Sequence, residues 1–136
     1  MKTRRQLGFS LTELLIVVAL IAVLAGIAWP SYKNSVQKTR RADGKEALLS
    51  AAAMQEKIFL QRNRYSGDIS ELGGNASKDG HYTISVTQSG GNTTYLLTAT
   101  ATGVQTSDSD CSTFTVNHIG LQKAYDSGSS ENPDCW

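Results

Sequence analysis

The stretch GFSLTELLIVVALIAVLAGIAWP, residues 8–30, determines how this chain is organised. Three basic side chains lie among the five residues at the start of the chain, and every residue from Leu14 to Trp29 is apolar or glycine. Counted from Phe9, the segment holds 21 residues, which corresponds to about 31 Å of α-helix at about 1.5 Å per residue. That length spans the hydrocarbon core of a bilayer, which is about 30 Å thick. We therefore predict one membrane-spanning helix over residues 9–29.

Glu13 stands inside this apolar segment. A carboxylate near the centre of a membrane helix costs about 2.5 to 3.5 kcal/mol on insertion scales, and less near the interface. Such a residue usually marks a function that involves a partner, whereas the plainer interpretation is a solvated carboxylate at headgroup depth. An ordinary secretory signal fits poorly, because its only local small-x-small cleavage site is Gly26-Ile27-Ala28.

The pair Gly8-Phe9, the Glu13 carboxylate and the apolar helix that ends before Pro30 resemble the prepilin signature of the type IV pilin family. The resemblance implies that prepilin peptidase removes a leader, residues 1–8, by cutting after Gly8 on the cytoplasmic side of the inner membrane. It implies that the new N-terminal residue, Phe9, is then N-methylated. Glu13 would be the assembly residue, pairing with the positively charged N-terminus of a neighbouring subunit, which answers the cost of a charge in hydrocarbon.

The chain thus divides into a leader at 1–8, a transmembrane and assembly helix at 9–29, and a globular periplasmic or extracellular domain at 30–136. A length of 136 residues leaves room for one compact domain beside the helix. The positive-inside rule does not set the orientation, because basic residues follow the helix as densely as they precede it. The cut site and the cysteines place the domain outside the cytoplasm. The resemblance implies a single-pass inner-membrane protein before assembly and an extracellular pilus afterwards.

The only two cysteines, Cys111 and Cys135, lie near the C-terminus. They lack the spacing of a zinc site. In an exported domain, an even pair separated by a polar stretch predicts a disulfide that closes a C-terminal loop. Two unlinked thiols would fit a cytosolic protein instead.

The remaining pattern predicts an α+β fold, in which one long N-terminal helix packs on a small antiparallel sheet. Pro30 should kink or loosen the helix where it leaves the membrane, because proline lacks a backbone donor. Apolar residues at helical spacing predict that the helix continues and packs through one face. We assign Tyr32, Val36, Ala47, Leu48, Ala51, Met54, Ile58 and Phe59 to this apolar stripe, and Lys38, Arg40, Arg41, Lys45, Glu46 and Glu56 to the outward face. We expect the part of the stripe from Ala47 to Phe59 to pack on the globular domain.

Alternation of apolar and polar residues predicts strands at 82–87 and 95–102, joined in a hairpin by a turn at 89–92. A third strand is expected at 112–117, with Phe114 and Val116 turned inward. The stretch between the helix and the hairpin predicts a surface connection with one short helical turn.

No set of residues predicts catalysis, a cofactor or a metal, and we do not expect an enzyme. His81 and His118 stand alone in the sequence, where a surface or sheet role is far commoner than acid-base catalysis. The carboxylates of Asp108 and Asp110, with Asp126 or Glu131, could hold calcium, but no ligand-loop spacing supports this. We interpret this region as a solvated loop.

The leading hypothesis is a structural subunit of a type IV pilus, used for motility, adhesion or DNA uptake. Its partners would be other pilin subunits, prepilin peptidase and an inner-membrane assembly platform. The short chain and its Asp134-Cys135-Trp136 end look closer to minor pilins than to major ones. A type II secretion pseudopilin is an alternative, although the resemblance implies that calcium usually replaces the cysteine pair in major pseudopilins.

A DNA-binding competence pilin is a further alternative. Residues 62–136 carry four basic and eight acidic side chains, and this balance argues against nucleic acid as the main partner because phosphates need neutralising. A small patch of Arg62, Arg64 and Lys78 could still bind DNA.

Overall fold

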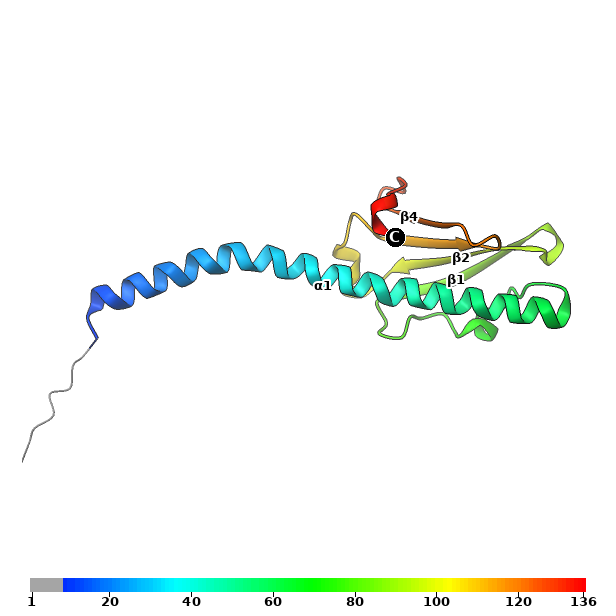
Figure 1. The fold of residues 1–136 in the computed structure, drawn as a ribbon, viewed down its shortest axis with the longest axis horizontal. Helices are drawn as coiled ribbons and strands as arrows, with labels where there is room; N and C mark the ends of the chain where they lie inside the picture. The colour runs from blue at the N-terminus through cyan, green and yellow to red at the C-terminus, as the bar shows by residue number, and fades with distance from the viewer. Residues whose placement is uncertain (1–8) are drawn as a thin grey trace, which may run out of the picture. The chain divides into compact units, whose positions relative to one another are not determined.

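The computed structural model describes residues 9–136 (Figure 1). A long helix, α1 (Leu11–Arg62), precedes a sheet made of β1 (Tyr82–Ser89), β2 (Thr94–Ala101), β3 (Thr113–Asn117) and β4 (Gln122–Tyr125). Short 3-10 turns lie at η1 (Ile69–Leu72), η2 (Gly90–Asn92), η3 (Gly103–Ser107) and η4 (Pro133–Cys135). Internal contacts divide the chain after Val36, and the second compact unit is Gln37–Trp136. We call this unit the globular unit.

The first part of α1 exposes its apolar side chains. Its most apolar window of 18 residues has a mean hydropathy of 2.7, and none of that window is buried. By length and composition this helix can cross a membrane. The helix runs through Pro30 as one element, so the expected kink or loosening at this residue stays a prediction.

Within the globular unit, one face of α1 is buried at alternating intervals of four and three residues. Ala51 and Ile58 lie on this face as predicted, but Met54 is 41% exposed, so its assignment was wrong. The neighbouring Gln55 is fully buried in its place. The five positions of this face are Gly44, Leu48, Ala51, Gln55 and Ile58.

Gly44 allows α1 to approach the sheet closely. A Cβ atom at this position would lie 2.7 Å from the nearest ring atom of Tyr82. Glycine inside a helix normally costs about 0.5 to 1 kcal/mol relative to alanine. The close packing of the Tyr82 ring, which is fully buried, explains why a glycine stands here.

The four strands form one antiparallel sheet in the order β1-β2-β3-β4. The predicted hairpin is confirmed, with Tyr82 opposite Ala101 and Ser89 opposite Thr94. Phe114 and Val116 are buried as predicted. The later half of α1 lies along the sheet (Figure 1), and the α+β prediction is confirmed. The strand β4 was not predicted, because four residues offer too little alternation to recognise.

The C-terminal segment is attached to β3 and to the residues just before that strand. A disulfide joins Cys111 to Cys135, whose Cα atoms are 5.7 Å apart, and this confirms the predicted pairing. The Trp136 ring packs edge-on against Phe114 with 5.6 Å between centroids. The Lys45 ammonium lies 5.4 Å from the Phe114 centroid and 5.5 Å from that of Trp136. Lys45, predicted to face outward, is therefore partly covered and holds this corner by cation-π contact.

Candidate assembly site and surface sites

The predicted assembly residues lie at the start of the described chain. Gly8, the residue before the expected cut, lies outside the described residues. The next residue, Phe9, is 82% exposed. Glu13 is exposed in the first turn of α1, where a carboxylate favourably opposes the positive end of the helix dipole. Within residues 9–136 it forms no ion pair, so cleavage, methylation and assembly pairing stay predictions.

Arg41 and Asp108 form an ion pair between α1 and the segment that follows η3. The Arg41 Nε atom lies 2.6 Å from Asp108 Oδ2, and its Nη2 atom lies 2.7 Å from Oδ1. Only 15% of the Arg41 side chain and 2% of the Asp108 side chain are exposed. The hydrogen bond to Asp108 raises the pKa of the Arg41 guanidinium. The predictions of an outward Arg41 and of a solvated loop at Asp108 were therefore wrong.

Gln105 extends this ion pair into the core. Its Nε2 atom donates to Asp108 Oδ2 at 2.9 Å and to the Tyr82 hydroxyl at 3.2 Å. Burial raises the pKa of Tyr82 to about 12. Together, the ion pair and the Gln105 hydrogen bonds attach the connection between β2 and β3 to the first turns of α1 in the globular unit.

Two other carboxylates that were considered for calcium, those of Asp126 and Glu131, form local contacts. Asp126 Oδ1 accepts hydrogen bonds from the backbone N–H groups of Gly128 and Ser130 and so closes a turn. Glu131 forms an ion pair with Lys123 at 2.7 Å. Across the described residues, no cluster of three or more His, Cys, Asp or Glu side chains could hold a metal ion.

Asp43 fastens α1 to the segment that leads into β1. Its carboxylate accepts from Ser77 Oγ at 2.6 Å, and from the backbone N–H groups of Asp79 at 3.1 Å and His81 at 3.3 Å. Burial alone would raise the pKa of this carboxyl, but the three hydrogen bonds, together with the electrostatic attraction of His81, outweigh burial and hold the pKa below its ordinary value. His81 contributes here through its backbone, which is a structural role.

Asp43→Asn should therefore reduce the stability of the globular unit in a pH-dependent way. Because the folded pKa is lowered, the stabilisation is present above the unfolded pKa of about 3.9 and is lost as pH falls through the folded value. We expect a deficit of about 1 to 2 kcal/mol at pH 7, shrinking below about pH 4. Urea unfolding of parent and variant between pH 2.5 and 7 measures this.

Asp134→Asn is the matched control for this prediction, because Asp134 is exposed. It should follow the parent at every pH. A deficit in Asp43→Asn that stays constant across the whole pH range would contradict a role for the carboxylate charge.

Gln55 holds the connection between α1 and η1. Its Nε2 atom donates to the Ser66 carbonyl at 2.7 Å, and its Oε1 atom accepts from the Ser66 N–H at 2.8 Å. Both backbone groups of Ser66 are thereby satisfied inside the protein. Sequence reasoning missed this residue, although a polar side chain at helical spacing between Ala51 and Ile58 was a usable signal.

The proposed basic patch does not form as a unit. Arg62 is paired with Glu71 at 2.9 Å. Arg62 and Arg64 line a hollow beside η1, whereas Lys78 lines a different groove. The prediction that these three cations gather into one patch was wrong.

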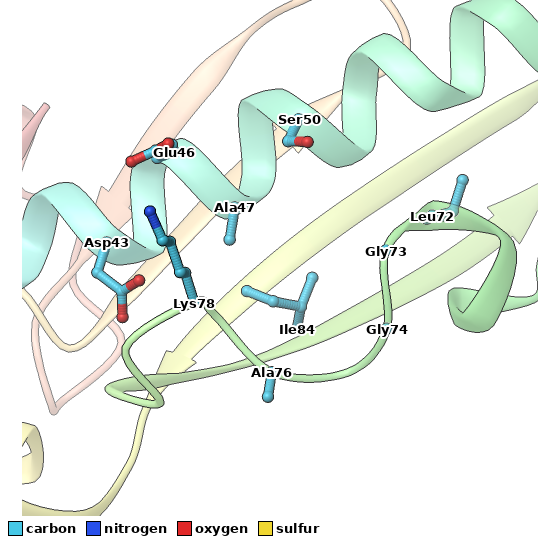
Figure 2. A pocket seen from close by; sticks show the side chains of 10 residues that line it. All are labelled: Asp43, Glu46, Ala47, Ser50, Leu72, Gly73, Gly74, Ala76, Lys78 and Ile84. Carbon is cyan, nitrogen blue, oxygen red and sulfur yellow. The ribbon is translucent and has the colours of Figure 1, made fainter.

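The groove at Lys78 has a volume of about 270 Å³ and lies between α1 and residues 72–78 (Figure 2). Ala47 and Ile84 lie among its lining residues, and the Lys78 side chain extends toward the part of α1 that carries Asp43 and Glu46. Charged and apolar groups are mixed here, and no convergent set of polar groups selects a ligand.

Two family models match the chain. One, described as type IV minor pilin ComP, DNA uptake sequence receptor, matches residues 30–115. The other, the prokaryotic N-terminal methylation motif, matches residues 3–29. Together they cover the helix and most of the sheet, and they confirm the resemblance seen in the sequence.

Named relatives agree with the family models. The chain is 32% identical over 101 residues to fimbrial protein EcpC of Eikenella corrodens, covering 73% of this chain and 66% of that one. It is 32% identical over 87 residues to the type IV major pilin protein PilA of Myxococcus xanthus, covering 64% of this chain and 40% of that one. The chain thus spans between 40% and 66% of the length of these two relatives.

A solved structure supports the fold. The high-resolution structure of a type IV pilin from Shewanella oneidensis superimposes with a TM-score of 0.52 at 21% identity, covering 63% of this chain and 89% of that one. Since the ComP model matches more than half of the residues, this chain belongs to the type IV pilin family, within the minor pilins that this model describes.

Proposed function

We propose that this chain is a structural subunit of a type IV pilus, held in the inner membrane and then polymerised into an extracellular filament. The observation that carries the proposal is the exposed apolar segment of α1. No residue of its most apolar 18-residue window is buried. Because exposed apolar surface is unfavourable in water, this segment needs to be surrounded by lipid or packed against other copies of the same helix. A filament core built from these helices satisfies that need after the chain leaves the bilayer.

The assembly chemistry that we propose resides at Phe9 and Glu13. Prepilin peptidase would cut after Gly8 and methylate the new N-terminus at Phe9, and the match of the methylation motif to residues 3–29 supports this step. The N-terminal ammonium of one subunit would then pair with the Glu13 carboxylate of its neighbour. Because both charges would lie in an apolar environment, each would stabilise burial of the other.

Intact-mass measurement and N-terminal sequencing of the chain from sheared surface fibres test this proposal. We expect a mature chain that starts at methylated Phe9 and is found in the fibres. Cleavage after the small-x-small site Gly26-Ile27-Ala28 would instead leave a chain that starts at Trp29. Such a chain, or one that keeps its leader, would contradict the proposal and indicate an ordinary secreted or anchored domain.

A second candidate function is reception of DNA within the pilus. The observation that favours it is the description of the matching family model as a DNA uptake sequence receptor. The acidic balance of residues 62–136 weighs against it. Titration of purified fibres with duplex DNA at low and physiological salt distinguishes the two functions, because a filament subunit without a receptor role should show no affinity at physiological salt.

A further inference from the structure

The segment after the apolar helix carries an unusual excess of positive charge. Four basic side chains lie between Lys33 and Arg41, and no aspartate or glutamate occurs between Glu13 and Asp43. Such an excess normally marks the cytoplasmic side of a membrane helix. The proposed function places this segment on the opposite side, so its charge needs another explanation.

The protein itself neutralises one of the four cations. Arg41 is paired with the buried carboxylate of Asp108. Lys33 and Lys38 are exposed and Arg40 is partly exposed, and none of the three forms an ion pair within residues 9–136. The three unpaired cations are therefore available to an external anion.

The residues just before the cations are those of a membrane interface. Trp29 is 76% exposed and Tyr32 is 70% exposed. Such aromatic side chains concentrate at headgroup level, and the lysines and arginines beyond them extend into the headgroup layer. Lys33, Lys38 and Arg40 follow Trp29 by 4, 9 and 11 residues in the sequence. Cations that follow a membrane-spanning segment so closely in sequence are attracted to anionic headgroups.

We infer that Lys33, Lys38 and Arg40 bind the phosphate groups of anionic phospholipids in the outer leaflet of the membrane that holds the chain before assembly. The inference rests on the proposed function, because only a membrane-held chain meets these headgroups. The order of apolar segment, aromatic pair and unpaired cations favours a lipid over other anions. Each cation near an anionic surface should raise affinity about fivefold.

Energy transfer from Trp29 to labelled lipids tests the inference on the full chain in vesicles. A Trp136→Phe background removes the other tryptophan of the chain. Transfer to dansyl-labelled phosphatidylglycerol is compared with transfer to dansyl-labelled phosphatidylcholine. The test variant carries Lys33→Gln, Lys38→Gln and Arg40→Gln, and the control carries Lys57→Gln, Lys78→Gln and Lys123→Gln, which removes the same charge from positions further along the chain.

In the background chain and in the control, we expect energy transfer from Trp29 to indicate at least a threefold enrichment of phosphatidylglycerol over phosphatidylcholine around the helix. In the test variant, we expect equal transfer to the two lipids. The enrichment should vanish at 1 M salt, where the Debye length falls to about 3 Å. Equal transfer to both lipids in the background chain would overturn the inference while leaving the proposed function intact. Failure of the chain to float with the vesicles would instead contradict the proposed function.

One further outcome separates a lipid from a nucleic acid. If the test variant kept its lipid preference but lost affinity for duplex DNA, the cations would serve nucleic acid and the inference would be overturned. If it lost the lipid preference and bound DNA as the background chain does, the lipid inference would be supported.

Discussion

Glu13→Gln is expected to reduce the amount of this chain in sheared fibres by at least tenfold and to leave the processed chain in the membrane. The amide has nearly the shape of the carboxylate but cannot neutralise the N-terminal ammonium of a neighbouring subunit. That ammonium would then enter the filament core unpaired, which costs far more than the 1.4 kcal/mol that a tenfold change represents. Quantitative immunoblots of fibre and membrane fractions measure the distribution.

Two control variants separate charge from shape in this experiment. Glu13→Asp keeps the charge on a shorter side chain and should retain more fibres than Glu13→Gln. Glu46→Gln neutralises an exposed carboxylate on the same helix, within the globular unit, and should assemble like the parent. Parental amounts of Glu13→Gln in fibres would contradict the assembly role.

The parts of this fold that the sequence predicted are those with a local pattern. The long helix follows from an apolar run joined to an amphipathic run, and the hairpin of β1 and β2 follows from alternating residues around a Gly-Gly turn. The disulfide between Cys111 and Cys135 was predictable because the chain holds no other cysteine. The signals for the helix and the hairpin are local in the sequence, and two cysteines allow only one disulfide.

The features that were missed depend on contacts between distant residues. Arg41 and Asp108 are 67 residues apart in sequence, and no local pattern distinguishes them from the solvated charges around them. Met54 and Gln55 are adjacent but point about 100° apart on the helix. Both have helical spacing from Ala51 and Ile58, and the buried face is the one that carries Gln55. In this buried position, the Gln55 side chain forms hydrogen bonds with both backbone groups of Ser66, a contact between distant parts of the fold that no local pattern shows.

Asp108→Ala is expected to lower the free energy of unfolding of the globular unit by about 3 to 4 kcal/mol. The substitution leaves the Arg41 guanidinium largely buried without an anion, and Gln105 loses its acceptor. Urea unfolding of the full chain in detergent measures the loss. Asp110→Ala is the matched control, because Asp110 is exposed two residues further on and should cost less than about 0.5 kcal/mol.

Replacing both partners by apolar residues should cost much less than removing one. In Arg41→Met combined with Asp108→Leu, no charge remains in the packed region, and we expect at least half of the loss in Asp108→Ala to be recovered. Such a result would mean that the pair contributes little net stability and instead selects where the connection between β2 and β3 attaches to α1. A double variant less stable than Asp108→Ala would argue that the ion pair itself stabilises the globular unit, and a double-mutant cycle completed with Arg41→Met and Asp108→Leu would give its magnitude.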